Sequence, residues 1–164
     1  MNKKLLVFVS STYKDLQEER QAAVQAVLKS GHIPAGMELF SAGDKSQLET
    51  IYNWIDECDV YMLILGGRYG SIDKETGLSY TELEYDYARQ KNKPYFAVVI
   101  KKEALEAKVK TKGTEVLETE NPKLLKDFQE KVLGSISSFF EDVKDVKLAV
   151  YESLGDLATD PSLS

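Results

Sequence analysis

Apolar residues in this chain gather into short continuous runs, and between the runs they recur every three or four positions. Continuous runs occupy residues 5–9, 60–65 and 95–100, as expected for strands that are buried on both faces of a sheet. Weaker strand patterns occupy residues 32–40, 136–140 and 146–151.

The segments between these runs show helical periodicity. Ser79, followed three residues later by Glu82, is a capping box that marks the start of one helix. Ser46 begins a second capping box, and Thr12 with the acidic residue three positions later resembles a third. The predicted helices cover residues 13–30, 46–57, 79–92 and 121–133.

Two segments fit this alternation less well. Residues 101–120 are rich in Lys and Glu without a clear period, which indicates a surface insertion. Residues 153–156 look like the start of a further helix, and the chain ends a turn or two later. We therefore expect the chain to be a module of a longer protein.

Strands and helices alternate from residue 5 to residue 133. This order predicts one α/β domain over residues 1–164, a doubly wound parallel sheet of about five strands flanked by helices. If the first strand is central, the ligand crevice lies outside the carboxyl ends of the strands at 5–9 and 60–65. Periodicity predicts this crevice but no chemistry.

The net charge, the length of the apolar runs and the numbers of cysteine and histidine exclude several classes of function. The 164 residues include 21 Lys and Arg against 27 Asp and Glu, a net charge of −6, which argues against nucleic-acid and anionic-membrane binding. The apolar runs are too short to span a bilayer, and the N-terminus lacks a signal-peptide pattern. One cysteine, Cys58, and one histidine, His32, exclude an intrachain disulfide and Cys-rich or multi-His metal sites. We expect a cytoplasmic protein without a metal.

The first strand ends in three hydroxyl side chains, Ser10, Ser11 and Thr12. Hydroxyls at a helix N-terminus suit an anion, because the free N–H groups and the helix dipole both favour negative charge. Helix capping explains one of the three equally well. The chain has neither a GxGxxG motif nor a Walker lysine pattern, so classical dinucleotide or P-loop binding is unsupported.

The strand at 60–65 ends in a glycine-rich turn. Gly66 and Gly67 allow a ligand to approach the backbone closely, and Arg68 could clamp a phosphate or a carboxylate. Tyr69 either stacks on a base or covers the end of the sheet. A plain glycine turn with a solvated arginine is the competing interpretation.

The predicted helix at 79–92 contains two glutamates, of which one has a structural role that its position explains and the other does not. Glu82 is the third helical residue of the capping box, so its substitution by Gln is expected to cost ~1 kcal/mol of capping energy. Glu84 has no capping role and lies at the margin of the buried face near the carboxyl end of the sheet. A carboxylate there can serve as nucleophile or general base, or can hold a ribose hydroxyl; an acidic first turn that complements the dipole is the alternative.

The chain resembles a widespread family of domains of unknown function. Such domains are commonly the N-terminal module of larger proteins, ahead of NACHT-like NTPase or repeat regions. The match extends over nearly the whole chain, and it adds Glu38 and Glu82 to the residues expected to contact a ligand. It rests on the segments 6–20, 36–38, 59–61, 67–70 and 79–85.

That family is in turn similar to two better-understood groups. Residues 7–11 look like the first box of Toll/interleukin-receptor (TIR) domains, whose catalytic members cleave the nicotinamide bond of NAD with a glutamate in a Glu-x-x-x-Ala sequence. Residues 84–88, followed by an apolar strand, are similar to the nucleophile region of nucleoside 2-deoxyribosyltransferases. Both resemblances select Glu84. Tyr80-Thr81 replaces the Trp-Cys pair of many TIR domains and Asp86 replaces the deoxyribosyltransferase glycine, so the substrate stays open.

These resemblances imply a flavodoxin-like, TIR-like module that binds a nucleotide or nucleoside, with no cofactor required and NAD as one possible substrate. If the module is an enzyme, it is an N-glycosyl hydrolase or transferase with Glu84 as the catalytic residue. The alternative is a non-catalytic module of a signalling or defence protein that self-associates or docks a partner.

Overall fold

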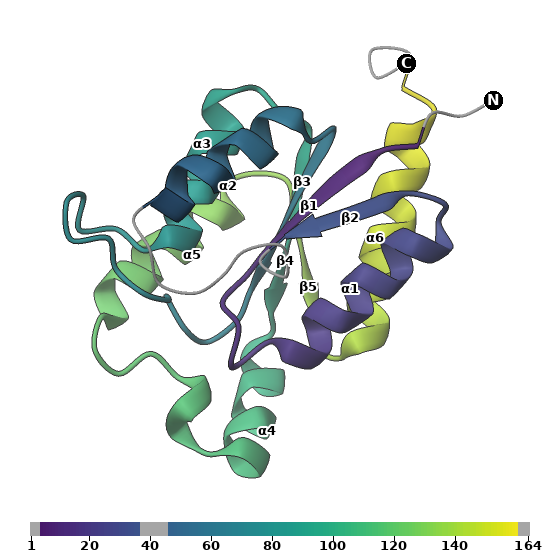
Figure 1. Ribbon diagram of the computed structural model, residues 1–164. Coiled ribbons are helices and arrows are strands. Elements are labelled where there is room, and N and C mark those ends of the chain that lie inside the picture. Colours follow the sequence, from purple (N-terminus) through teal and green to yellow (C-terminus); the bar gives the residue numbers. More distant parts are fainter. Residues whose placement is uncertain (1–3, 37–45, 161–164) are drawn as a thin grey trace.

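The computed structural model describes residues 4–36 and 46–160, which form a parallel sheet flanked by helices (Figure 1). The strands are β1 (Leu6–Ser10), β2 (Ile33–Gly36), β3 (Val60–Leu65), β4 (Tyr95–Ile100) and β5 (Ser137–Phe140). The helices of the described residues are α1 (Gln17–Lys29), α2 (Ser46–Glu57), α3 (Tyr80–Gln90), α4 (Lys102–Lys112), α5 (Pro122–Leu133) and α6 (Val143–Ala158).

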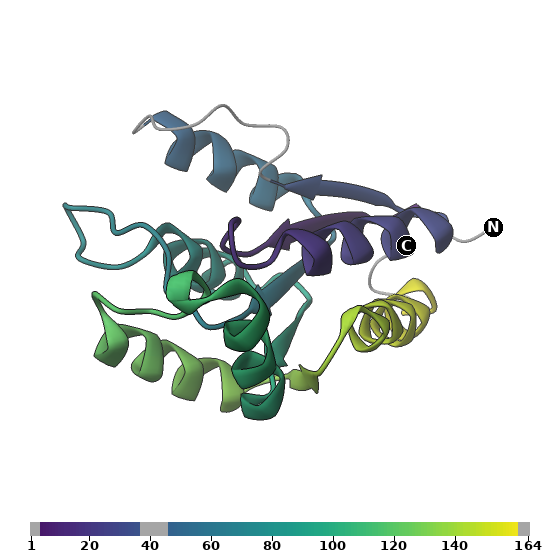
Figure 2. The same cartoon turned by 90° about the horizontal axis from the view of Figure 1, so that it is seen from below.

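The strand order is β2-β1-β3-β4-β5, with every neighbouring pair parallel. Figure 2 shows β2 and β5 at opposite edges of the sheet. This is the doubly wound α/β fold that the sequence predicts. The order reverses between β1 and β3, and in such sheets ligands bind outside the carboxyl ends of the strands at the reversal.

Helices cover both faces of the sheet and bury two apolar clusters. On one side, α1 and α6 pack against side chains such as Val7, Val9 and Met62. On the other, α2, α3 and α5 pack against side chains such as Phe8 and Tyr61, and Figure 1 shows the two helical layers separated by the sheet. None of the described helices is long and apolar enough to cross a membrane.

The alternation of side chains along β1 determines which way Ser10 and Ser11 point at its carboxyl end. Successive side chains of a strand face opposite sides of the sheet. Val7 and Val9 face α1 and α6, whereas Phe8 faces α2 and α3. Ser10 therefore continues the Phe8 side, and Ser11 continues the side of α1.

The prediction of a strand at residues 146–151 is wrong, because these residues lie within α6. The buried residues of that helix are Val146, Val150 and Leu154, each four positions from the next, as one face of a helix requires. The further helix expected to start at 153–156 is the same helix. A segment of six residues rich in apolar side chains fits the period of a strand and the period of a helix equally well, so the sequence pattern could not distinguish them.

The first helix is also shorter than predicted. It begins at Gln17, and its N-cap is Leu16, which makes no side-chain capping bond. The Thr12 hydroxyl instead donates to the Asp15 carboxylate within the loop.

Residues 101–120, expected as a surface insertion, contain α4 and a 3-10 helix, η2 (Thr114–Val116). Val116 is buried, and Leu105 packs against the apolar cluster on the α1 side. Lys108 Nζ lies 2.8 Å from Glu19 Oε2 of α1. The segment is thus tied to the body of the domain; its pattern is weak because none of the α4 residues is fully buried.

We expect Gly67→Ala to destabilise the fold by about 1–3 kcal/mol, because an added methyl group would overlap protein atoms. A Cβ at this position would meet the Val116 carbonyl oxygen and would lie 2.6 Å from Leu105 Cδ1. Gly155→Ala is the matched control. That position is helical with nothing within 4 Å, so alanine should stabilise by about 0.5–1 kcal/mol. Chemical denaturation measures both, and unchanged stability of Gly67→Ala would contradict the docking of η2 against the glycine turn.

Candidate functional site

Glu84 reaches the carboxyl end of β1. Its helix starts as the sequence predicts, with the Ser79 hydroxyl accepting a hydrogen bond of 3.1 Å from the Glu82 amide. Five residues further on, Glu84 faces the sheet, and Ser10 Oγ donates to Glu84 Oε1 over 3.0 Å. Two residues that lie 74 positions apart in sequence, both predicted as site residues, are therefore in direct contact.

The protein environment makes Glu84 a weaker acid than a free glutamate. Burial raises its pKa from 4.5 to about 7, against the opposing effects of the Ser10 hydrogen bond and the positive charge of Arg20. Arg20 itself is buried and donates to Ser11 Oγ over 3.3 Å. At neutral pH both protonation states of Glu84 are populated, a property common among catalytic carboxyl groups.

Two tyrosines that the sequence did not single out as site residues lie near Glu84. Burial raises the pKa of both Tyr52, from α2, and Tyr61, from β3, and the charge of Glu84 is the second cause in each case. Tyr61 is fully buried, whereas Tyr52 keeps some exposure. Tyr61 occurs within an uninterrupted apolar run, so a polar tip in a buried strand was the signal that could have identified it.

The other two hydroxyls at the end of β1 bond within the protein. Ser11 Oγ donates to the Thr12 carbonyl over 2.7 Å and accepts from Arg20. Thr12 donates to Asp15, whose pKa is raised by burial. Of the three hydroxyls predicted to contact a ligand, the structure thus directs Ser10 to Glu84 and uses Ser11 and Thr12 to shape the loop.

The glycine turn after β3 is packed against the chain itself. A Cβ at Gly66 would contact Leu16 and Asp15, and one at Gly67 would meet Val116. The close approach that these glycines permit is therefore to protein atoms.

Tyr69 covers the end of the sheet, which is one of its two predicted roles. The residue is fully buried, its amide donates to Glu118 Oε1 over 2.8 Å, and its hydroxyl donates to Glu82. Arg68 is half-buried. Its charge partly offsets the burial that raises the Asp15 pKa, and it adds to the backbone hydrogen bonds that hold the Glu118 pKa below its ordinary value. Arg68 is the cation of this turn at the carboxyl end of the sheet.

Glu82 has a different structural role from the one predicted. Its carboxylate is buried and accepts hydrogen bonds from Tyr69 and from Lys131 of α5, and Lys131 also lies 3.0 Å from Asp86. The network joins the glycine turn, α3 and α5. Glu82 and Glu84 both lie on α3, but the Glu82 carboxylate bonds to Tyr69 and Lys131, whereas Glu84 bonds to Ser10. Glu38, also predicted to contact a ligand, lies outside the described residues.

A hollow of about 620 Å³ lies along α1 and the edge strand β2. It is lined by Gln17, Arg20 and Gln21 of the helix and by residues 34–36 of the strand. Arg20, which lines this hollow, also donates to Ser11 at the end of β1, so the hollow adjoins the predicted crevice.

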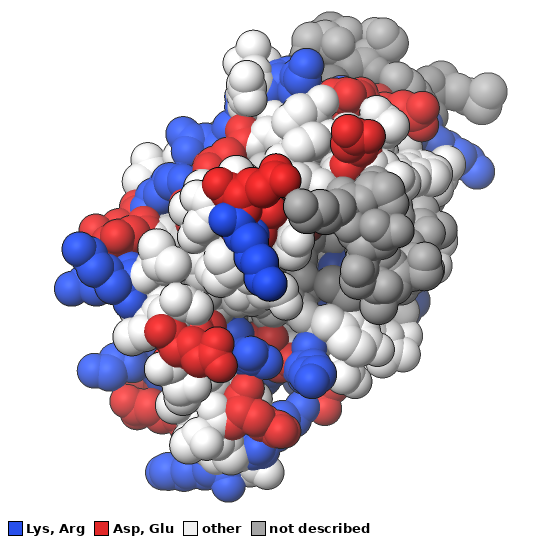
Figure 3. All heavy atoms as spheres, turned by 60° about the vertical axis from the view of Figure 1, so that its left-hand side comes forward, with Lys and Arg blue, Asp and Glu red and all other residues white. Residues whose placement is uncertain are grey.

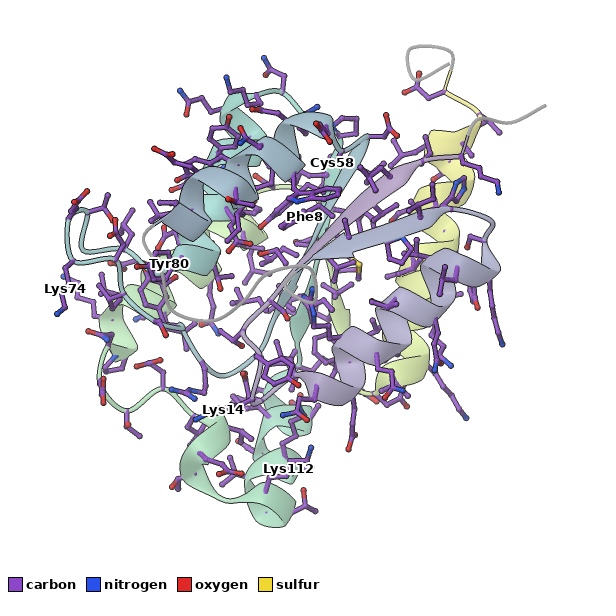
Figure 4. All side chains as sticks on the ribbon, in the orientation of Figure 1. Phe8, Lys14, Cys58, Lys74, Tyr80 and Lys112 are labelled. Atoms are coloured by element: carbon purple, nitrogen blue, oxygen red, sulfur yellow. The ribbon has the colours of Figure 1, made fainter. Side chains whose placement is uncertain are left out.

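Charged side chains of both signs lie on the surface of the domain. Figure 3 shows acidic and basic side chains interspersed over one face. Figure 4 places Lys14, in the β1–α1 loop, and Lys112, on α4, toward the carboxyl end of the sheet, with Cys58 toward the opposite end. Within residues 4–36 and 46–160, no group of three or more His, Cys, Asp or Glu side chains is arranged to hold a metal ion.

Residues 6–155 match the model of the protein family described as "Domain of unknown function (DUF4062)". The chain belongs to this family. A comparison with curated proteins gave no match. Among solved structures, the chain is similar to the crystal structure of a diflavin flavoprotein A3 from Nostoc sp. The TM-score is 0.45 at 16% identity, with 96% of this chain and 92% of that chain covered.

Glu84→Gln should change how stability depends on pH. The Glu84 carboxyl has a pKa of about 7 in the folded protein and 4.5 as its ordinary value, so the folded state binds more protons than the unfolded state between these values. The native chain should therefore lose stability relative to Glu84→Gln as pH rises through this window, by on the order of 3 kcal/mol. Denaturation of both proteins from about pH 4 to about pH 8 measures the difference, and parallel curves would contradict a raised pKa of the Glu84 carboxyl.

Glu82→Gln should lower the free energy of unfolding by more than the capping energy alone, because the Glu82 carboxylate pairs with the positive charge of Lys131. We expect a coupling of about 1–2 kcal/mol between Glu82→Gln and Lys131→Met in a double-mutant cycle. A glutamate that served only as part of a cap would give additive effects instead.

Proposed function

We propose that this domain binds a nucleoside or nucleotide at the carboxyl ends of β1 and β3 and cleaves or transfers its N-glycosidic bond through Glu84. The contact between Ser10 and Glu84 carries the proposal. The resemblances to TIR domains and nucleoside 2-deoxyribosyltransferases select the same glutamate. Nucleosides and NAD share the ribosyl bond to a base that such a carboxylate acts on.

The chemistry requires a carboxylate beside the anomeric carbon. As the bond to the base breaks, its electron pair leaves with the base and positive charge develops on the sugar, which an adjacent carboxylate stabilises. Glu84 either screens this charge while water attacks, or attacks the carbon itself to form a glycosyl ester that water or a second base then displaces. In both routes the ionised form of Glu84 acts.

Neighbouring groups support these roles. Ser10 donates to one oxygen of Glu84 and thereby orients the carboxylate. Arg68 is the cation of the glycine turn, and we assign it to a phosphate of the ligand, because guanidinium pairs with phosphate in a bidentate geometry. Ser10 is assigned to a sugar or phosphate oxygen, whereas Ser11, which bonds to the Thr12 carbonyl and to Arg20, shapes the loop.

Exposed apolar side chains favour the second candidate function, an interaction module that self-associates or docks a partner or fused NTPase or repeat region. Leu133, Ile136 and Phe139 are 44%, 64% and 52% exposed, and Phe139 lies on the edge strand β5. Edge strands with apolar side chains are common sites of association.

Base release tests the first proposal directly. The purified chain is incubated with NAD and with a panel of nucleosides at low and high protein concentration, and the free base is followed by chromatography. We expect release by the native chain and a loss of at least about 100-fold in Glu84→Gln, because the amide cannot screen or attack the developing cation.

Asp86→Asn is the control for this experiment. It removes a carboxylate from the same helix that pairs with Lys131, and it should retain activity. An equal loss of base release in Glu84→Gln and Asp86→Asn would contradict a specific role of Glu84. No release, together with concentration-dependent association and no rise in melting temperature with NAD or nucleosides, would favour the interaction module.

A further inference from the structure

The Tyr61 hydroxyl is a buried polar group. Tyr61 is 0% exposed, and among the described residues its hydroxyl has no hydrogen-bond partner. Folded proteins pair nearly all buried polar groups, because an unpaired one loses its bonds to water without compensation. A phenylalanine would bury the same ring without this cost, so the hydroxyl itself requires an explanation.

Strand register directs this hydroxyl toward the Glu84 site. Tyr61 of β3 pairs with Phe8 of β1, and Ser10 lies two residues further along the same face. The Tyr61 ring stacks on Phe8, with centroids 6.0 Å apart and planes at 9°. Burial raises the Tyr61 pKa well above its ordinary value, Glu84 raises it further and Ser10 lowers it. The ring is thus surrounded by apolar groups, and its polar tip lies near Ser10 and Glu84.

We propose that Tyr61 is a positioning residue of this site: its hydroxyl pairs with Ser10 Oγ, which pairs in turn with Glu84 Oε1, so that three side chains form one hydrogen-bonded chain. This inference rests on the proposed function and deepens it. Ser10 already lowers the Tyr61 pKa through hydrogen bonding, and contacts of this kind tighten when a substrate is bound.

The chain of bonds fits both protonation states of Glu84. When Glu84 is ionised, Tyr61 donates to Ser10 and Ser10 donates to the carboxylate, and each bond polarises the next. When Glu84 carries a proton, its O–H donates to Ser10 and Ser10 donates to Tyr61. Hydroxyl groups can reverse direction in this way because each is both donor and acceptor. Tyr61 therefore stabilises the ionised form of Glu84 through Ser10.

Tyr85 provides a matched control within the same apolar cluster. It is also 0% exposed, and its hydroxyl likewise has no hydrogen-bond partner among the described residues. Its ring contacts Tyr61, Tyr95 and Phe128 at centroid distances of 6.3, 5.9 and 5.6 Å. Burial raises the pKa of Tyr85 and hydrogen bonding with Ser135 lowers it, and Glu84 is not among the groups that shift it. Removing this hydroxyl tests the effect of a second buried phenol in the same cluster, one whose pKa Glu84 does not shift.

The experiment compares Tyr61→Phe and Tyr85→Phe in the full chain. The Glu84 pKa is measured by NMR of carbon-13-labelled glutamate, with Glu84→Gln to assign the signal. We expect Tyr61→Phe to raise the Glu84 pKa by up to about one unit and to lower base release below that pKa by up to about tenfold, since the carboxylate fraction falls in proportion. Tyr85→Phe should match the native chain in both readouts, and both variants should keep or gain thermal stability.

Ser10→Ala shows whether Tyr61 acts through Ser10. Ser10→Ala alone should raise the Glu84 pKa, and adding Tyr61→Phe to it should produce little further change, because the chain is already broken. Additive shifts would overturn the proposed route.

The outcomes separate this inference from the proposed function. A Glu84 pKa that is the same in Tyr61→Phe and the native chain overturns the inference even if the native chain releases base. A native chain that releases no base, but in which Tyr61→Phe shifts the Glu84 pKa, contradicts the proposed function and supports the hydrogen-bonded chain.

Discussion

The position of β1 inside the sheet is the constraint on which the rest of the site depends. β1 lies between β2 and β3, and helices cover both faces of the sheet, so its alternating side chains are divided between two layers. The first polar residues after its apolar run are divided in the same way. Ser10 contacts Glu84 of α3, and Ser11 contacts Arg20 of α1. The strand thus links two helices through adjacent hydroxyls that point in opposite directions.

The loops around this point are fixed by buried polar bonds between segments that lie far apart in sequence. Glu118, after α4, accepts the Tyr69 amide, and Glu82 accepts the Tyr69 hydroxyl. The three hydrogen bonds that Glu118 accepts from backbone amides contribute to a pKa below the ordinary value, against the opposing effect of burial. The carboxylates of Glu118 and Glu82 therefore hold the glycine turn in place. Glu84, on the same helix as Glu82, contacts the end of β1 instead.

The sequence predicted those features that depend on local pattern. The three apolar runs became β1, β3 and β4, and the Ser79 cap lies where the capping box predicts it. Glu84 was singled out because no local role explained it, and its contact with Ser10 agrees with that reasoning.

Features that depend on distant contacts escaped prediction. The partners of Tyr69 come from 13 and 49 residues away, and no spacing rule relates such positions. The polar neighbours of Tyr61 follow from the register of β3 on β1, which becomes known only once the strands are paired. The wrong prediction of a strand at 146–151 has a different cause: six residues are too few to distinguish a buried strand from the buried face of a helix.

The cost of this arrangement is concentrated at one end of the sheet. Over most of their length the strands bury apolar side chains, which pack without any demand for partners. At the carboxyl end the same layers hold a carboxyl whose ionisation burial opposes, and a phenol hydroxyl that has no hydrogen-bond partner in the part of the chain that the structure describes. Apolar side chains of similar size would pack there at lower free energy. Polar groups that reduce stability and meet at a topological switch point are what a binding or catalytic site requires, because folding alone gives no reason to place them there.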